Sequence, residues 1–376
     1  AARLYCDLEK ADEPVLLSVA DRIRRSPELL AFAWYVYWRL FIDTAPGDGG
    51  EAARWPELQS ALGENGRCLY VLAALGMIPF VKQYHHALGV TDDAITRNTC
   101  LQVKSFVDNH RRATYRPGMF SQIEWLANYP RQPYFRIGRL VFWEKPNEPG
   151  PEVFRRRGTL ETLALAQDGI SFSPDGFINP PDSNVGWRSS LVRTPESIAG
   201  TPISPAGHAE NRIVTLSLAE WECVLKPGDM ILDMHIPAGG QMSLEVCAES
   251  FRSARSFFSR QFPCRPAVAI VCRSWIFSPN LPQFLPPDAN LVQFMEECYT
   301  FPLGWGRQAG LWFVFFQEKF DPATVPRKSR LQRALAEHLE KGGDLRAGGM
   351  FYLLDDIERF GTRHYRNAGL AKSTPP

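Results

Sequence analysis

The chain has 376 residues, of which 45% are hydrophobic and 22% charged, and its formal net charge is +1. This balance is typical of a folded protein of one or two domains, and it provides no strong overall field for attracting nucleic acid or a charged membrane surface. The eight cysteines are scattered without a Cys-x-x-Cys pair, so we expect free thiols in a reducing, cytoplasmic compartment.

The first third of the chain has the apolar spacing of helices. Pro27 directly after Ser26 is a strong helix start with Ser26 as N-cap, and Thr91 before two aspartates is a second N-cap signal. The most apolar run contains Arg39 and is too short to span a membrane, so we expect a buried helix there. The sequence predicts helices over residues 12–24, 29–41, 67–75 and 92–110.

The pattern changes near residue 134. Residues 134–143 read as one strand, which would place Arg136 and Arg139 on opposite faces. Residues 144–152 are rich in Pro, Glu and Gly and are expected to form a loop. Residues 179–210 are dense in Pro, Ser, Asn and Gly and predict a long irregular segment.

The most informative segment runs from residue 228 to residue 260. It predicts a strand over 230–236, a glycine turn, and a helix over 243–260. Backbone N–H groups at such a turn and the helix N-terminus form an anion site, although many proteins use the glycines only to turn the chain. The turn is neither a Walker loop nor a dinucleotide fingerprint. The candidate anion ligands are Ala238, Gly239, Gly240, Gln241 and Ser243.

Further elements complete an αβ region. The remaining patterns predict a buried strand over 267–275, a helix over 290–298, a strand over 311–316, a helix over 329–341 and a strand over 350–354. We therefore expect an α+β protein with a helical domain of residues 1–133 and an αβ domain of residues 134–370. The strands 230–236 and 267–275 should be adjacent and parallel, joined by the 243–260 helix.

Two residues of the central strand are candidates for acid–base chemistry. Asp233 and His235 are two apart, so they share a face, and His235 with a pKa of about 7 would be a suitable general base oriented by Asp233. A structural histidine bonded to backbone is the alternative, and it would leave water or a carboxylate such as Glu144 as the base. His85 and His86 are expected in a polar turn, where adjacent histidines chelate poorly, and no other spacing indicates a metal site.

Several segments together resemble a known family. In chain order, these segments are Arg136-Ile-Gly-Arg-Leu-Val-Phe, Gly228-Asp-Met-Ile-Leu-Asp-Met-His-Ile-Pro-Ala-Gly-Gly, Cys272-Arg-Ser-Trp, Leu285-Pro-Pro-Asp-Ala-Asn, Leu331-Gln-Arg-Ala-Leu and Gly349-Met-Phe-Tyr-Leu-Leu-Asp-Asp. Over most of its length the chain is similar to bacterial acyltransferase domain-containing proteins, which pair a helical N-acyltransferase N-terminal domain with a GNAT-like C-terminal domain.

The resemblance implies an acyltransferase. Its co-substrate would be acyl-CoA, or an acyl carrier protein presenting the same phosphopantetheine arm, and its acceptor the amine or hydroxyl of a small molecule, without a metal. GNAT enzymes bind the CoA pyrophosphate at the turn after the central strand, and here Pro237-Ala-Gly-Gly-Gln-Met-Ser departs from their usual motif. If the strands splay as in GNAT proteins, Arg273 lies across the pantetheine channel from His235 and binds a phosphate or a substrate carboxylate. A salt bridge across the sheet is the alternative.

Two other functions are compatible with the sequence. The degenerate glycine turn and the lack of an obvious glutamate base favour a non-catalytic GNAT-like module that binds CoA, a carrier arm or a partner protein. A cupin-like metalloenzyme is weakly suggested by the segment from Gly228 to Gly239, but the chain lacks the His-x-His of that motif, and the helix after the turn argues against it.

Overall fold

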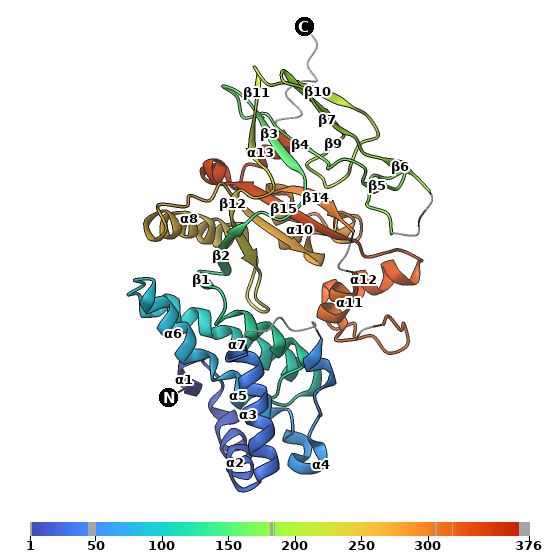
Figure 1. Cartoon of the computed structure of the whole chain (residues 1–376). Coiled ribbons are helices and arrows are strands. Elements are labelled where there is room, and N and C mark those ends of the chain that lie inside the picture. Colours follow the sequence, from blue (N-terminus) through green and yellow to red (C-terminus); the bar gives the residue numbers. More distant parts are fainter. Residues whose placement is uncertain are drawn as a thin grey trace. The chain divides into compact units, whose positions relative to one another are not determined.

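The computed structural model describes residues 2–43, 50–180, 183, 185–304, 307–317 and 319–367. It divides into two compact units: Ala1–Trp143 with His235–Gly240, and Glu144–Met234 with Gln241–Pro376. The first unit is helical, and the second contains a mixed β-sheet with flanking helices (Figure 1). The expected α+β fold class is thereby confirmed.

Seven α-helices are described in the first unit. They are α1 (Ala2–Tyr5), α2 (Glu13–Arg25), α3 (Pro27–Phe41), α4 (Gln59–Leu62), α5 (Cys68–Ala74), α6 (Met77–Ala87) and α7 (Asp93–Thr114). Their apolar faces bury a core that includes Val36, Tyr70 and Phe106. Among the described helices of the whole chain, none combines the length and apolar character that crossing a membrane requires.

Local capping explains where two of these helices begin. The Ser26 hydroxyl accepts a hydrogen bond from the Leu29 N–H at 3.2 Å, which confirms Ser26 as the N-cap of α3. The N-cap of α7 is Asp92, whose carboxylate accepts from the Ala94 N–H at 2.8 Å. The assignment of that cap to Thr91 was therefore wrong by one residue.

Residues 134–143 form a hairpin rather than one strand. Strand β1 (Phe135–Ile137) pairs antiparallel with β2 (Leu140–Pro146), and Gly138 turns the chain with a φ of 63°. This left-handed conformation favours glycine, which is why the turn falls there. Arg139 consequently lies in the turn and not on a strand face, and β2 continues into the segment that was expected to be loop.

The second unit is built around one mixed β-sheet, which contains both parallel and antiparallel strand pairs. The strand order is β2-β12-β13-β15-β14, with β12 (Met230–His235), β13 (Ala269–Ser274), β14 (Tyr299–Leu303) and β15 (Ala347–Leu353). Strands β12 and β13 are parallel and are joined by α8 (Leu244–Gln261), as predicted, whereas β13–β15 and β14–β15 are antiparallel. A parallel βαβ unit of this kind excludes the cupin-like alternative.

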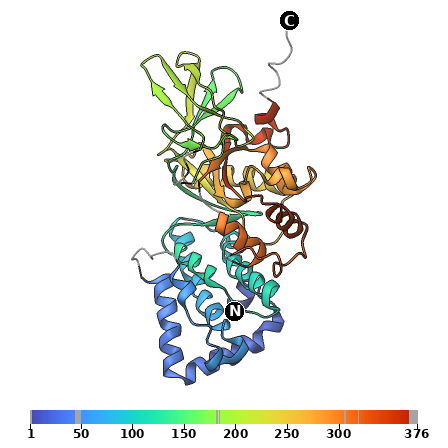
Figure 2. The ribbon, with the colours of Figure 1, turned by 90° about the vertical axis from the view of Figure 1, so that its right-hand side faces the viewer.

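The two faces of this sheet have different neighbours. On one face, Phe251 of α8 contacts Tyr352 of β15 and Phe294 of α10 (Asn290–Glu297) through ring pairs 5.7 and 6.0 Å apart. On the other face, the hydroxyl of Tyr299 accepts a hydrogen bond from the Ala164 N–H at 3.1 Å and donates one to the Ile203 carbonyl. Ala164 and Ile203 belong to a smaller sheet. Figure 2 shows the strands of the smaller sheets, in green and yellow, gathered in the upper part of the view.

The smaller sheets are built from short strands. They are β3 (Glu152–Arg156), β4 (Thr162–Leu165), β9 (Pro202–Ile203) and β11 (Trp221–Leu225); β7 (Leu191–Arg193), β8 (Ser197–Gly200) and β10 (Val214–Ser217); and β5 (Ser171–Phe172) with β6 (Trp187–Arg188). Four of them, β6 to β9, lie in the segment 179–210, which was expected to be irregular. Strands of two to four residues are too short to show a periodic pattern.

The remaining helices of the second unit are α9 (Leu281–Phe284), α10 (Asn290–Glu297), α11 (Arg307–Phe315), α12 (Arg330–Glu340) and α13 (His364–Asn367). The prediction of a strand over 311–316 was wrong, because this apolar run is part of α11. Leu311, Val314 and Phe315 are buried while Phe313 is 43% exposed, which is the spacing of a helix face.

A buried carboxylate joins the smaller sheet to the C-terminal residues. Asp356 is 1% exposed; it forms an ion pair with Arg155 of β3, and His364 Nε2 lies 3.1 Å from its Oδ2. The Tyr365 hydroxyl donates to the same carboxylate at 2.9 Å. Burial by itself raises the pKa of Asp356, but the hydrogen bonds from His364 and Arg155 outweigh it and lower the pKa from 3.8 to about 2.

We predict that this network makes stability sensitive to acid. Because the folded-state pKa is depressed, the stabilisation is complete above the unfolded pKa of 3.8 and is lost as the pH falls toward 2. Asp356→Asn should lower the free energy of unfolding near neutral pH by about 3–5 kcal/mol, because it removes the charged partner of Arg155, whose side chain is only 13% exposed. Urea unfolding at several pH values measures both effects. Glu358→Gln, at a side chain that is 69% exposed, is the control and should change little; equal stability of the two variants would contradict the prediction.

Candidate functional site

The parallel pairing of β12 and β13 ends before either strand does. The ladder joins Ile231 to Ala269, Leu232 to Ile270, and Asp233 to Val271. Beyond that point β13 continues to Ser274 with β15 beside it. Among the described residues, no strand pairs with β13 over residues 272–274 on the side away from β15. An extended ligand with amide groups can add to such a strand edge as a further strand does.

The glycine turn directly follows β12 in the chain. Gly239 and Gly240 have φ angles of 79° and 73°, which L side chains rarely adopt, and both are exposed. Arg139 from the β1–β2 turn is 9% exposed and donates from Nη2 to the Pro237 carbonyl at 2.8 Å. A Cβ atom at Gly240 would lie 3.2 Å from Arg139 Nε. The turn therefore has a guanidinium packed against it, which favours an anion there.

Helix α8 begins immediately after this turn. Ser243 is its N-cap, but the side chain makes no capping hydrogen bond to the first turn of the helix. The first backbone N–H groups of α8 therefore receive no side-chain cap from Ser243, and the partial positive charge of the helix end is added to them. Ala238 is half-buried and Gln241 is exposed.

His235 is the last residue of β12, and its surroundings disfavour the protonated, positively charged form of its imidazole. Its ring stacks on Trp125 of the 3-10 helix Ser121–Asn128, with centroids 5.4 Å apart. Burial, together with the positive charges of Arg139 and Arg136, lowers the pKa of His235 from 6.5 to about 4. The imidazole is therefore neutral at physiological pH, and its pKa is well below the value of about 7 assumed from the sequence.

Asp233 is paired with a lysine. It is 7% exposed, and its Oδ2 lies 2.5 Å from Lys145 Nζ of β2. Burial raises the pKa of Asp233, and the charge of Lys145 opposes that rise. Lys145 Nζ also lies 2.6 Å from Glu148 Oε1. These contacts give Asp233 a partner other than His235, so its expected role in orienting the histidine finds no support in its bonding.

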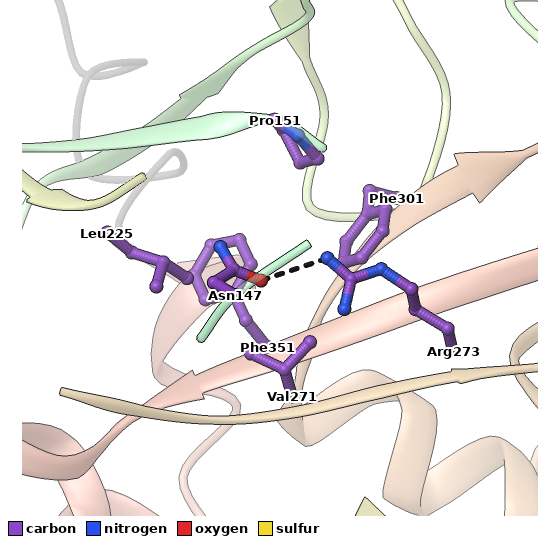
Figure 3. Close-up of a pocket in the computed structure, with 7 residues that line it drawn as sticks. All are labelled: Asn147, Pro151, Leu225, Val271, Arg273, Phe301 and Phe351. Carbon is purple, nitrogen blue, oxygen red and sulfur yellow. Dashed lines mark hydrogen bonds between the residues drawn. The ribbon is translucent and has the colours of Figure 1, made fainter. Parts of the chain in front are cut away.

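Arg273 lines a small pocket of the second unit. The other lining residues are Asn147, Pro151, Leu225, Val271, Phe301 and Phe351 (Figure 3). Arg273 Nη2 donates to Asn147 Oδ1 at 2.9 Å and to the Glu148 carbonyl at 3.2 Å. The closest approach to the Glu148 carboxylate is 4.0 Å, from Arg273 Nε. Arg273 therefore belongs to a group of charges with Lys145, Asp233 and Glu148.

Glu144 has the properties of a poised carboxyl group. Its Oε1 atom is buried and has no hydrogen-bond partner among the described residues. Burial raises the pKa of Glu144 from 4.5 to about 7, although the charge of Arg265 acts in the opposite direction. Because side chains alternate along a strand, Glu144 lies on the opposite face of β2 from Lys145. Its pKa is close to the value that suits a general base at neutral pH.

Two family models match the chain. Residues 2–131 match the N-acyltransferase N-terminal domain, and residues 134–351 match the GNAT-like C-terminal domain. No curated protein matches the sequence.

Solved acyltransferase structures are similar to the chain in fold. An acyltransferase variant in complex with octanoyl-CoA has 20% sequence identity and a TM-score of 0.59, with 93% of this chain and 86% of that one covered. An acyltransferase in complex with decanoyl-CoA has 21% identity and a TM-score of 0.53, with 92% and 84% covered. An acyltransferase in complex with CoA and 10C-teicoplanin has 20% identity and a TM-score of 0.52, with 94% and 98% covered.

The raised pKa of Glu144 predicts a measurable effect on stability. A carboxyl group whose pKa is higher in the folded state than in the unfolded state lowers the free energy of unfolding once the unfolded chain ionises. For Glu144 this loss of stability begins above pH 4.5 and reaches its full size above pH 7. Glu144→Gln removes it. We expect the variant, relative to wild type, to gain up to about 3 kcal/mol in unfolding free energy between pH 4 and pH 8. Denaturant unfolding at the two pH values provides the measurement, and a difference independent of pH would show that Glu144 titrates normally.

Proposed function

Because the chain belongs to the family with a GNAT-like C-terminal domain, here preceded by an N-acyltransferase N-terminal domain, we propose that it is an acyltransferase. It transfers an acyl group from a pantetheine thioester to an amine or hydroxyl of a small molecule. The donor is acyl-CoA, or an acyl carrier protein that presents the same arm. The eight free cysteines support a reducing, cytoplasmic site of action.

The observation that carries this proposal is the early end of the β12–β13 ladder at Asp233 and Val271. A pantetheine arm is extended and contains two amide groups, so it matches the open edge of β13 over residues 272–274. The CoA pyrophosphate is proposed separately to bind at the turn of residues 238–243, on backbone N–H groups and on Arg139. Similar structures bound to octanoyl-CoA and decanoyl-CoA support an acyl-CoA donor, and one bound to 10C-teicoplanin supports a small-molecule acceptor.

Catalysis in this proposal depends mainly on holding the thioester and the acceptor together. An amine acceptor is mostly protonated at neutral pH, so a base assists its attack. His235 is the first candidate because it ends β12 and its neutral imidazole can accept a proton. Glu144 is the second candidate because its pKa of about 7 is closer to the working pH.

Direct CoA binding tests the proposed donor site. Gly240→Val adds a branched side chain 3.2 Å from Arg139 Nε, at a φ of 73°, and should weaken CoA binding by about tenfold or more by blocking the turn. Gly228→Val is the matched control, because Gly228 has a φ of 89° but no atom within 4 Å of an added Cβ. Calorimetric titration with CoA compares the two folded variants. Equal affinities would argue against a site at the glycine turn.

Turnover and its pH dependence identify the base. If His235 is the base, His235→Gln should lower kcat by roughly 10²–10⁴ with little change in CoA affinity. Because the pKa of His235 is about 4, wild-type kcat/KM should then not rise between pH 6 and pH 8 through this group. Steady-state rates with octanoyl-CoA and a panel of amines give these values. A rate that rises through pH 7, is abolished in Glu144→Gln and survives in His235→Gln would assign the base to Glu144.

A further inference from the structure

The pocket around Arg273 contains a cationic donor that the protein leaves unsatisfied. The Arg273 side chain is only 8% exposed. Its Nη1 atom is buried and has no hydrogen-bond partner among the described residues. A buried guanidinium nitrogen without an acceptor is unfavourable by itself, so a ligand oxygen that completes its bonding would be bound strongly.

The guanidinium is held rigidly in place. Asn147 Oδ1 accepts from Arg273 Nη2, and Asn147 is itself fixed by a bond from Nδ2 to the Lys226 carbonyl at 3.1 Å and from its backbone N–H to the Asp229 carbonyl at 2.7 Å. The Phe301 ring centroid lies 5.8 Å from the guanidinium carbon. Figure 3 shows Asn147 beside the guanidinium, at the dashed hydrogen bond, and Phe301 above it; Val271 and Phe351 also line the pocket.

The shape of the pocket depends on a glycine. Gly349 of β15 is paired with Arg273 of β13 and with Phe301 of β14. A Cβ atom at Gly349 would lie 2.2 Å from the Phe301 ring, so the ring occupies the space that a side chain would need. Nη1 is buried beside apolar side chains, and the low local dielectric there strengthens any charged hydrogen bond that it makes.

The chemistry of the pocket favours a carboxylate. The neighbouring charges of Lys145, Asp233, Glu148 and Arg273 sum to zero, and the two carboxylates each have Lys145 Nζ within 2.6 Å. The Glu148 carboxylate makes no hydrogen bond with Arg273, because their closest approach is 4.0 Å. A water or an amide carbonyl would accept from Nη1, but a carboxylate forms the stronger, charge-assisted bond with a guanidinium.

We propose that Arg273 Nη1 binds a carboxylate of the acyl acceptor. The acceptor class is then an amine that also bears a carboxylate, such as an amino acid or a peptide with a free C terminus. This inference rests on the proposed acyl-transfer function for the identity of the ligand as acceptor, but the carboxylate site can be tested without the reaction.

The first test is binding to the wild-type protein without an acyl donor. The probes are 3-phenylpropanoate, whose narrow stem ends in a carboxylate, and 3-phenylpropanamide, which has the same shape without the charge. We expect the acid to bind about tenfold or more tightly than the amide in calorimetric titration, because only the acid makes a charge-assisted bond. Equal binding of the two probes would overturn the proposal, and this comparison needs no variant to fold.

The second test uses Arg273→Met, which keeps the length of the side chain and removes its donors. The preference for the acid should disappear in this variant and persist in Arg330→Met, a control at an arginine that is 65% exposed. In Arg273→Met the acid should lose far more affinity than octanoyl-CoA does. A loss of octanoyl-CoA affinity with the acid preference intact would assign Nη1 to the pantetheine arm and overturn the proposal. Carboxylate-selective binding without acyl transfer from any donor would contradict the proposed function and leave the carboxylate site standing.

Discussion

The short parallel pairing of β12 with β13 is the constraint on which the candidate site depends. Three residue pairs join these strands, whereas β13 and β15 are paired over six. Strand β13 can therefore leave β12 and still keep its place in the sheet. Among the described residues, no strand pairs with β13 beyond Val271 on that side. Asp233 and Arg273 lie near this point on β12 and β13, and the glycine turn follows β12 in the chain.

Polar side chains around this opening are kept apart by the alternation of the strands. On β2, Lys145 points toward Asp233 and Glu148, whereas Glu144 lies on the other face and has a buried oxygen without a partner. On β13, Arg273 occupies the same face as Val271 in the small pocket. Lys145, shared by two carboxylates, and Arg273, held by an amide, thus occupy one face of the sheet. Glu144, whose pKa is near 7, occupies the other.

The histidine and the glycine turn show how neighbours alter the chemistry of a motif. His235 was a plausible base by its position at the end of a strand, but burial and the positive charges of Arg139 and Arg136 keep its imidazole neutral by lowering its pKa. The same Arg139 packs against Gly240 and bonds to Pro237, which adds a positive charge to the turn. One arginine therefore makes the histidine a weaker base and the turn a better place for an anion.

The sequence by itself determined the helical first part, the order strand–turn–helix–strand over residues 230–275 and the position of the glycines, because these follow from periodicity and from conformations that only glycine adopts easily. Tertiary structure decided the rest. The apolar run at Leu311 became a helix because packing, and not local pattern, selects the buried face, and Arg139 reached the glycine turn only through the β1–β2 hairpin. The pairing of Asp233 with Lys145, the unpartnered Nη1 of Arg273 and the raised pKa of Glu144 arise between residues far apart in the chain or from burial, and neither spacing nor residue type contains that information.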